Sequence, residues 1–325
     1  MKNPLEALID DARELARRAL AVLPAPASVN WAECPAAVWQ SGALGAGFIA
    51  HGGVDDITLA DLLWIDDQKR QIDVNTRQFL AGLPANNVLL WGARGTGKSS
   101  LVHALLNRYR GDGLRLVEVS RYRLASLPQI VRRLREEPYR FVLFCDDLSF
   151  EAEDASYKEL KSALEGSVFK ASSNVLIYAT SNRRHLLPEY FTDNENVVVR
   201  QGELHESEAV EEKISLSDRF GLWLSFYPFK QNAYLDVVEH WVRRLARAHD
   251  LELTWNDDLR AAALRWALAR GVRSGRTAEH FARHWVGRTL LDIKGGSNAG
   301  VCGSDLQIAN DSGNPPSQDT TPTAP

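Results

Sequence analysis

The sequence predicts an α/β fold in which a five-stranded parallel sheet is followed by a small helical domain. From about residue 86, short apolar runs alternate with segments of helical periodicity, and no strand is predicted beyond Pro228. Strands that are apolar along nearly their whole length and separated by helices are typical of a parallel sheet buried on both faces. The predicted strands cover residues 88–91, 114–119, 141–145, 175–179 and 222–227.

The helices are predicted from apolar residues that recur at helical spacing. Helices at 99–108, 127–137 and 155–168 connect the first four strands, and those at 232–249, 256–270 and 277–291 form the second domain. Another amphipathic helix at 5–20 ends before Pro24. We expect its apolar stripe to cover the body of this protein, with the surface of a partner as the alternative.

The same patterns divide the chain into four parts. Residues 27–55 show no clear periodicity, and the residues after 294 are polar, with few large apolar side chains. Such a segment buries too little apolar surface to offset its ordering entropy, so we expect a disordered tail. The parts are an N-terminal helical extension at 1–55, the α/β domain at 56–228, the helical domain at 229–293 and the tail at 294–325.

The composition is that of a folded soluble protein. Of the 325 residues, 45% are apolar and 25% are charged, and the net charge of −4 gives no overall attraction to nucleic acid or to an anionic membrane. No apolar run is long enough to cross a bilayer. The three cysteines, Cys34, Cys145 and Cys302, form no CxxC pair, and the N-terminus lacks the features of a secretory signal. We therefore expect a cytoplasmic protein with no membrane partner.

Residues 92–99 read GARGTGKS and match the phosphate-binding loop pattern GxxxxGK[ST] directly after the first predicted strand. Glycines let backbone N–H groups turn toward phosphate oxygens, and the following helix directs its positive end at them. A glycine turn with an exposed lysine is the alternative, which the strand before the loop and the helix after it disfavour. The predicted phosphate-binding residues are Gly92, Gly95, Thr96, Gly97, Lys98, Ser99 and Ser100.

Two acids, Asp146 and Asp147, directly follow the third predicted strand. In a site that hydrolyses ATP, the first would hold Mg²⁺ and the second would orient and polarise the attacking water. The alternative is that both acids begin a loop or cap a helix. The fourth predicted strand is the candidate to lie between this strand and the phosphate loop. It leads to Asn182, which could then bond the γ phosphate or the water, with Thr180 or Ser181 as alternatives.

With these motifs the chain resembles the AAA+ ATPases, and specifically the bacterial domain-of-unknown-function family numbered 815. The resemblance covers roughly residues 55–291. Besides the phosphate loop it depends on four stretches: ITLADLLWIDDQK at 57–69, FCDDLSF at 144–150, YATSNRRHLLP at 178–188 and EEKISLSDRFG at 211–221.

The resemblance implies a P-loop NTPase of AAA+ type, with the helical domain as a lid. It makes Lys98 and Ser99 the Walker A pair, Asp146 the Walker B metal acid and Asn182 the residue called sensor 1. Arg219 corresponds to the arginine finger, which contacts the γ phosphate of a neighbouring subunit. A surface arginine that caps a loop is the alternative.

Two further assignments come from the resemblance. Arg276 corresponds to the sensor 2 arginine of the lid, and the nearby Arg273 is the competing candidate. Three apolar residues before the sheet line an adenine pocket or belong to the ordinary core: Leu62, Leu63 and Ile65.

The function implied is an ATPase that uses ATP and Mg²⁺ and hydrolyses ATP at the subunit boundaries of a homo-oligomer, a ring or a head-to-tail assembly. Most AAA+ proteins carry Glu after the metal acid, whereas Asp147 is one methylene shorter, so we expect slow hydrolysis. The expected client is an unknown protein or nucleic-acid assembly. The alternatives are a nucleic-acid-associated ATPase resembling initiators or helicase loaders, and a nucleotide switch that does not hydrolyse.

Charge is distributed unevenly along the chain. Residues 108–140 hold nine arginines against four acids, residues 243–288 hold ten against five, and residues 186–218 hold nine acids against two basic residues. The basic stretches are either nucleic-acid faces or solvated helix surfaces. An acidic edge that meets a basic edge of a neighbour would produce head-to-tail assembly. His280 and His284 lie one helical turn apart, but no third metal ligand accompanies them.

Overall fold

The computed structural model describes residues 29–42, 45–53, 55–150, 173–184, 186, 198–200, 203–205 and 218–296, together with a few isolated positions (14, 157, 159–161 and 164). Apart from those positions, the predicted helices at 5–20 and 155–168 lie outside the described residues. The tail lies outside them from residue 297 onward.

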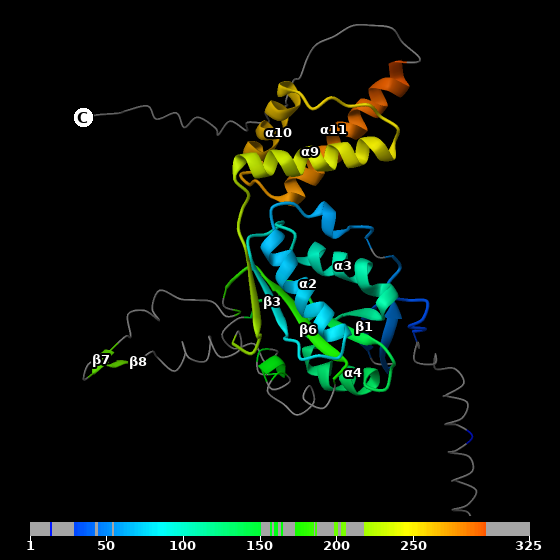
Figure 1. Cartoon of the computed structure of the whole chain (residues 1–325), viewed down its shortest axis with the longest axis vertical. Coiled ribbons are helices and arrows are strands. Elements are labelled where there is room, and N and C mark those ends of the chain that lie inside the picture. The colour runs from blue at the N-terminus through cyan, green and yellow to red at the C-terminus, as the bar shows by residue number, and fades with distance from the viewer. Residues whose placement is uncertain are drawn as a thin grey trace, which may run out of the picture.

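One sheet of seven strands forms the body, in the order β2-β1-β4-β5-β6-β3-β9 (Figure 1). The five predicted strands are all present and pair in parallel. They are β3 (Val88–Gly92), β4 (Leu114–Glu118), β5 (Arg140–Cys145), β6 (Val175–Ser181) and β9 (Leu222–Phe226). A separate two-stranded ribbon pairs β7 (Val198–Arg200) with β8 (Glu203–His205).

The predicted strand number of five is wrong, because a hairpin extends the sheet. β1 (Ala36–Gly42) pairs in parallel with β4 and antiparallel with β2 (Gly45–Ala50). Both strands fall within the predicted N-terminal extension, in the stretch without periodicity. Small residues occupy most of β1 and β2, so neither shows the alternation that would predict a strand. Burial at this edge depends largely on Trp39 and Phe48, whose rings meet edge to face with centroids 5.0 Å apart.

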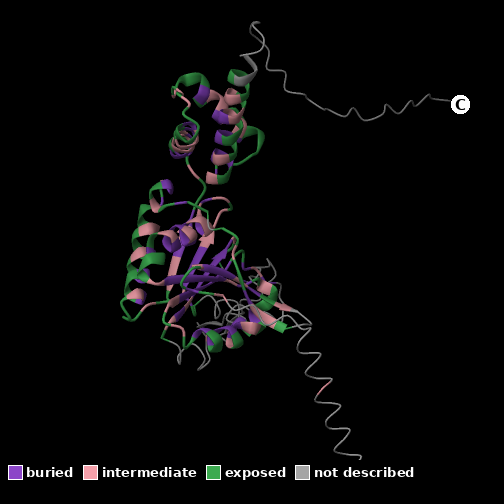
Figure 2. Ribbon diagram, turned by 90° about the vertical axis from the view of Figure 1, so that its right-hand side faces the viewer, coloured by how far each residue is buried: buried purple, intermediate pink, exposed green. Residues whose placement is uncertain are grey.

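Helices cover both faces of the sheet. Helix α2 (Asp66–Leu80), which the sequence pattern does not predict, and α3 (Lys98–Tyr109) pack on one face, and α4 (Leu127–Leu134) packs on the other. Along β3, Leu89 points into one core and its neighbours Val88 and Leu90 into the opposite one. Figure 2 shows the buried strands between the more exposed helices. Full burial of one such side chain contributes about 1.5–3 kcal/mol.

Three helices form the lid (residues 231–296), as predicted: α9 (Gln231–Ala248), α10 (Asp257–Ala269) and α11 (Gly275–Gly296). They enclose a separate core around Tyr234, Val238 and Phe281. In Figure 1 the lid lies at one end of the body, beyond the carboxyl end of β9. Among the helices of the described residues, none combines the length and the apolar character needed to span a membrane.

The strand order brings the predicted site together. Strand β6 lies between β5 and β3, as expected from the topology of the sequence. Because carboxyl ends of parallel strands share one edge of the sheet, the segments that follow β3, β5 and β6 meet there, as in other open α/β sheets.

Candidate functional site

The phosphate loop begins where β3 approaches β9. Gly92 adopts a φ of +127°, and a Cβ atom at this position would overlap the carbonyl oxygen of Phe226. That carbonyl accepts a hydrogen bond of 3.0 Å from the Ala93 N–H. Only glycine allows this close approach of two backbones at a positive φ. The loop then ends at Gly97, which is the N-cap of α3 and also has a positive φ.

Lys98 is buried at the start of α3. Its Nζ donates to the carbonyl oxygens of Gly92 and Ala93, both at 2.8 Å, and to Asn182 Oδ1 at 3.3 Å. Burial lowers the pKa of Lys98 to about 8, the charge of Arg276 acts in the same direction, and the charges of Asp146 and Asp147 oppose it. The ammonium is thus held inside the loop, where an anion would relieve its desolvation.

Ser99 and Asp146 face each other across the edge of the sheet. The Ser99 hydroxyl donates to Asp146 Oδ1 at 2.7 Å, and the Thr180 hydroxyl donates to the same oxygen at 2.5 Å. A hydroxyl and a carboxylate are hard oxygen ligands, and Mg²⁺ needs only one or two such groups when substrate phosphates complete its shell. The residues present therefore fit a magnesium ion bound together with a nucleotide. Within the described ranges there is no cluster of three or more His, Cys, Asp or Glu residues suited to a metal.

Asp147 has a left-handed backbone with φ of +52°. Asp tolerates this conformation better than most residues. Its N–H donates to the Thr180 hydroxyl at 2.8 Å, and its carboxylate accepts from the Asn182 amide. Thr180 therefore contacts both acids. Ser181, the other alternative at the end of β6, is buried, and its hydroxyl oxygen accepts a hydrogen bond from the nearby Arg183 N–H.

The lid contacts the phosphate loop directly. The Arg276 N–H donates to the Gly95 carbonyl at 3.2 Å, and a Cβ at Gly95 would come within 2.9 Å of the Ser274 hydroxyl. The Arg276 side chain lines the cleft, and its charge contributes to the lowered pKa of Lys98. Arg273 lies outside the cleft lining, and its carbonyl accepts from the Phe229 N–H. Between the two candidates, Arg276 is the one at the site.

These groups border one cleft of about 400 Å³ between the body and the lid. Its lining includes the phosphate loop and the polar residues that follow β5 and β6: Gly95, Thr96, Gly97, Lys98, Ser99, Ser100, Asp146, Asp147, Thr180 and Asn182. The lining also contains the three apolar residues considered for an adenine pocket, Leu62, Leu63 and Ile65, of which Leu62 and Ile65 lie next to Gly97 of the phosphate loop. Sequence reasoning assigned no role to Asp61, although it lies within the 57–69 stretch. It missed Val237, Trp241 and Glu279 because they lie in no motif and reach the cleft only through packing of the lid.

Arg219 lies away from this cleft. It precedes the amino end of β9 and lines a different surface cavity with Asp218 and Gly221. Since β9 runs parallel to β3, that position is at the opposite edge of the sheet from the phosphate loop. One chain therefore does not bring Arg219 to its own Lys98.

Two weaker candidates from the sequence have structural explanations. The His284 ring stacks on Trp266 with centroids 4.8 Å apart, so it takes part in packing within the lid. Cys145 is fully buried at the end of β5, and burial raises the pKa of its thiol to about 12.

A 26S proteasome regulatory subunit 6B homolog from Aspergillus niger is 29% identical over 157 residues, which cover 41% of this chain and 37% of that protein. The chain thus matches little more than a third of that relative's length.

Similar solved structures include the Thermotoga maritima RuvB Holliday junction branch migration motor and the Aeropyrum pernix ORC1 protein in complex with DNA. The first has a TM-score of 0.48 and 16% identity, with 74% of this chain and 67% of that chain covered. The second has a TM-score of 0.48 and 15% identity, with 71% of this chain and 60% of that chain covered. Because both scores lie below 0.5, the family assignment depends on the sequence.

A family model described as "Protein of unknown function (DUF815)" matches residues 32–289. The match includes the hairpin at the sheet edge, the phosphate loop, both acids after β5 and most of the lid. The P-loop α/β fold with its helical lid agrees with the AAA+ resemblance of the sequence. We conclude that this chain belongs to the DUF815 family.

Proposed function

We propose that the chain binds ATP with Mg²⁺ in the cleft and hydrolyses it at the boundaries between subunits of a homo-oligomer. The observation that carries this proposal is the convergence of Lys98, Ser99, Asp146 and Asn182 at one edge of the sheet, beside Arg276 of the lid. A cation, a metal-ligating pair and a polar sensor are the groups that phosphoryl transfer requires.

In this proposal Lys98 binds the β and γ phosphates, and Ser99 and Asp146 hold the metal. The metal, when bound with ATP, neutralises charge that develops on the phosphates. Asp147 orients the attacking water, Asn182 contacts the γ phosphate, and Arg276 contacts it from the lid. The apolar residues of the lining accept the base.

Arg219 completes the site from a neighbouring subunit. Its place at the opposite edge of the sheet from the phosphate loop supports this role, since a residue there can reach only the cleft of another copy. The client that hydrolysis remodels is a protein or nucleic-acid assembly, as expected for AAA+ proteins.

The test is Mg²⁺-dependent ATP turnover per protomer as protein concentration is raised, for wild type, Lys98→Ala and Arg219→Ala. We expect specific activity to rise with concentration and both substitutions to abolish it, while only Lys98→Ala weakens ATP binding. Turnover that is independent of concentration and survives Arg219→Ala would reject hydrolysis at subunit boundaries.

A nucleotide switch without hydrolysis is the second candidate, and one contact favours it. Asp147 and Asn182, the two residues assigned to the water and the γ phosphate, are hydrogen-bonded to each other. If nucleotide binding leaves that contact in place, one Asp147 oxygen and one Asn182 N–H stay occupied by each other, which leaves fewer groups free to orient a water. ATP binding without turnover at any protein concentration is the result this candidate requires.

A further inference from the structure

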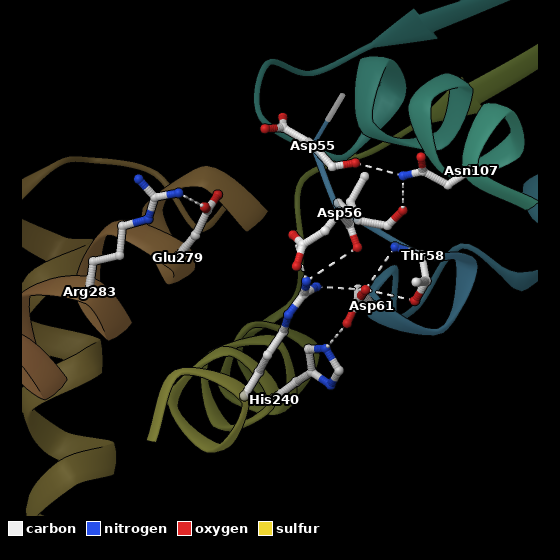
Figure 3. A network of polar contacts seen from close by, with 10 residues as sticks. Asp55, Asp56, Thr58, Asp61, Asn107, His240, Glu279 and Arg283 are labelled. Atoms are coloured by element: carbon white, nitrogen blue, oxygen red, sulfur yellow. Dashed lines mark hydrogen bonds and ion pairs between the residues drawn. The ribbon is translucent and has the colours of Figure 1, made fainter. Parts of the chain in front are cut away.

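A buried carboxylate joins the lid to the segment before the sheet. Asp61 ends the short 3₁₀ helix η1 (Leu59–Asp61) and is 8% exposed. Its Oδ1 lies 2.9 Å from His240 Nε2, and its Oδ2 lies 2.6 Å from Arg244 Nη1. Both partners belong to α9 of the lid, which follows about 180 residues later in the chain (Figure 3).

Both oxygens of the Asp61 carboxylate have protein partners. Besides the two lid residues, Oδ2 accepts hydrogen bonds from the Thr58 N–H at 2.8 Å and the Thr58 hydroxyl at 2.7 Å. Burial alone would raise the pKa of Asp61, but the hydrogen bonds from Thr58 and His240 and the charge of Arg244 together lower it. Although Asp61 lines the cleft, its oxygens are occupied, so we assign it no direct contact with a nucleotide.

The other polar contacts between this segment and α9 are exposed. Asp56 pairs with Arg244 at 2.9 Å, but its side chain is 95% exposed, and the bond from Trp64 Nε1 to Asp236 also lies at the surface. Exposed pairs contribute little, whereas removal of one partner from a buried pair leaves an uncompensated charge. Asp61 is therefore the dominant polar tie between η1 and α9.

The same two lid residues hold an aromatic wall of the cleft. Trp241 lines the cleft and lies between them in sequence. The His240 ring meets the indole edge to face with centroids 5.9 Å apart, and the Arg244 guanidinium lies 5.2 Å from the indole centroid. On the body side, Leu62 follows Asp61 directly and also lines the cleft. Contacts that tie α9 to η1 thus also hold Leu62 and Trp241, two residues of the cleft lining, in place.

We propose that Asp61, His240 and Arg244 form an interdomain clamp that positions the lid and Trp241 for retention of the nucleotide. The three are positioning residues, because they act through the walls of the cleft. The inference rests on the proposed function for its ligand, but the clamp itself is a property of the nucleotide-free chain. Loss of the clamp allows the lid to separate from η1, and bound nucleotide then dissociates faster.

The clamp is tested with Arg244→Met, which keeps most of the aliphatic stem but removes the charge, and with Arg244→Lys and Asp61→Asn. Arg243→Met is the matched control, since Arg243 is 52% exposed and pairs with Glu239 within α9 at 2.6 Å. Each full-length variant is checked by circular dichroism. The rate at which a fluorescent ADP analogue dissociates is then measured in the presence of Mg²⁺.

We expect Arg244→Met and Asp61→Asn each to raise the dissociation rate about tenfold or more. The double variant Asp61→Asn/Arg244→Met should dissociate little faster than either single variant, because both remove the same contact. Arg244→Lys should recover part of the loss. Arg243→Met should stay within about twofold of wild type. Equal rates for wild type and folded Arg244→Met and Arg244→Lys would overturn the proposal, as would full additivity in the double variant.

A distance measurement separates failure of the clamp from failure of nucleotide binding. Spin labels at Leu83 of the body and Leu268 of the lid, 57% and 81% exposed, report the separation of the two parts without ligand. Cys34 and Cys302 are replaced by serine, and the buried Cys145 stays unlabelled. We expect Arg244→Met to broaden and lengthen the distance distribution. An unchanged distribution would reject the clamp even if wild type failed to bind the nucleotide.

Discussion

Nucleotide affinity should fall steeply above pH 8, because the cation that binds phosphate loses its proton there. Burial lowers the pKa of Lys98 to about 8 in the nucleotide-free protein. The charged ammonium attracts phosphate oxygens and the neutral amine does not, so affinity is greatest below this pH and decreases above it. The ionisation of a phosphate group itself, near pH 6, is complete in this range and does not contribute.

The magnitude follows from the charged fraction. With a pKa of about 8, about nine-tenths of Lys98 is charged at pH 7 and about one-tenth at pH 9, since each pH unit corresponds to a factor of ten. If binding requires the charged form, the dissociation constant rises about tenfold between pH 7 and pH 9 and about thirtyfold by pH 9.5. An ordinary exposed lysine would leave affinity almost constant over this interval.

The assay is equilibrium binding of a fluorescent ATP analogue between pH 7 and pH 9.5, at constant ionic strength and magnesium concentration. Lys98→Arg is the control, because a guanidinium keeps its charge throughout this range. Its affinity should be lower than that of wild type at pH 7 but nearly independent of pH. The reasoning fails if wild type changes by less than about threefold, or if Lys98→Arg shows the same slope as wild type.

Three further substitutions test the site. Gly92→Ala should lower the free energy of unfolding by about 2–4 kcal/mol in urea titrations, because the added Cβ overlaps the Phe226 carbonyl. The control is Gly287→Ala, which should be neutral or stabilising because its Cβ would meet nothing within 4 Å. Thr180→Val removes the hydrogen bonds to both acids and should lower kcat about tenfold, while the nucleotide dissociation constant stays within about threefold of wild type. Equal losses in kcat and in nucleotide affinity would indicate misfolding. Asp147→Asn, which tolerates the left-handed backbone, should lower turnover about 100-fold or more without loss of ATP affinity; unchanged turnover would exclude Asp147 as the residue that activates water.

Local sequence signals were sufficient for the polar half of the site. The phosphate loop and the acids after β5 lie at the ends of strongly apolar strands, and strand ends in a parallel sheet meet at one edge. The chain separation between Lys98 and Asp146 also implied an intervening strand, and β6 occupies that place. The position of Asn182 followed from the same topology.

The features that sequence reasoning missed depend on contacts between distant segments. β1 is strand because it pairs with β4, and its small residues carry no alternating pattern of their own. Helix α2 is mostly polar, and its buried apolar residues are only Ile72 and Phe79, so its place in the fold is evident from packing and not from its sequence pattern. Trp241 and Glu279 belong to ordinary amphipathic helices, and only docking of the lid places them in the cleft.

Strand β9 is only five residues long, about 17 Å, yet it borders three regions with different proposed tasks. Its first residues follow the loop that holds Arg219, its last carbonyl bonds to Ala93 of the phosphate loop, and Phe229, shortly beyond it, lines the cleft and bonds to the lid. If subunits assemble as proposed, a displacement of Arg219 at the neighbour's phosphates would be passed along this one strand toward Ala93 and Phe229. Communication between the nucleotide sites of adjacent subunits would then depend on the rigidity of this single strand. It would not require a longer path through the protein.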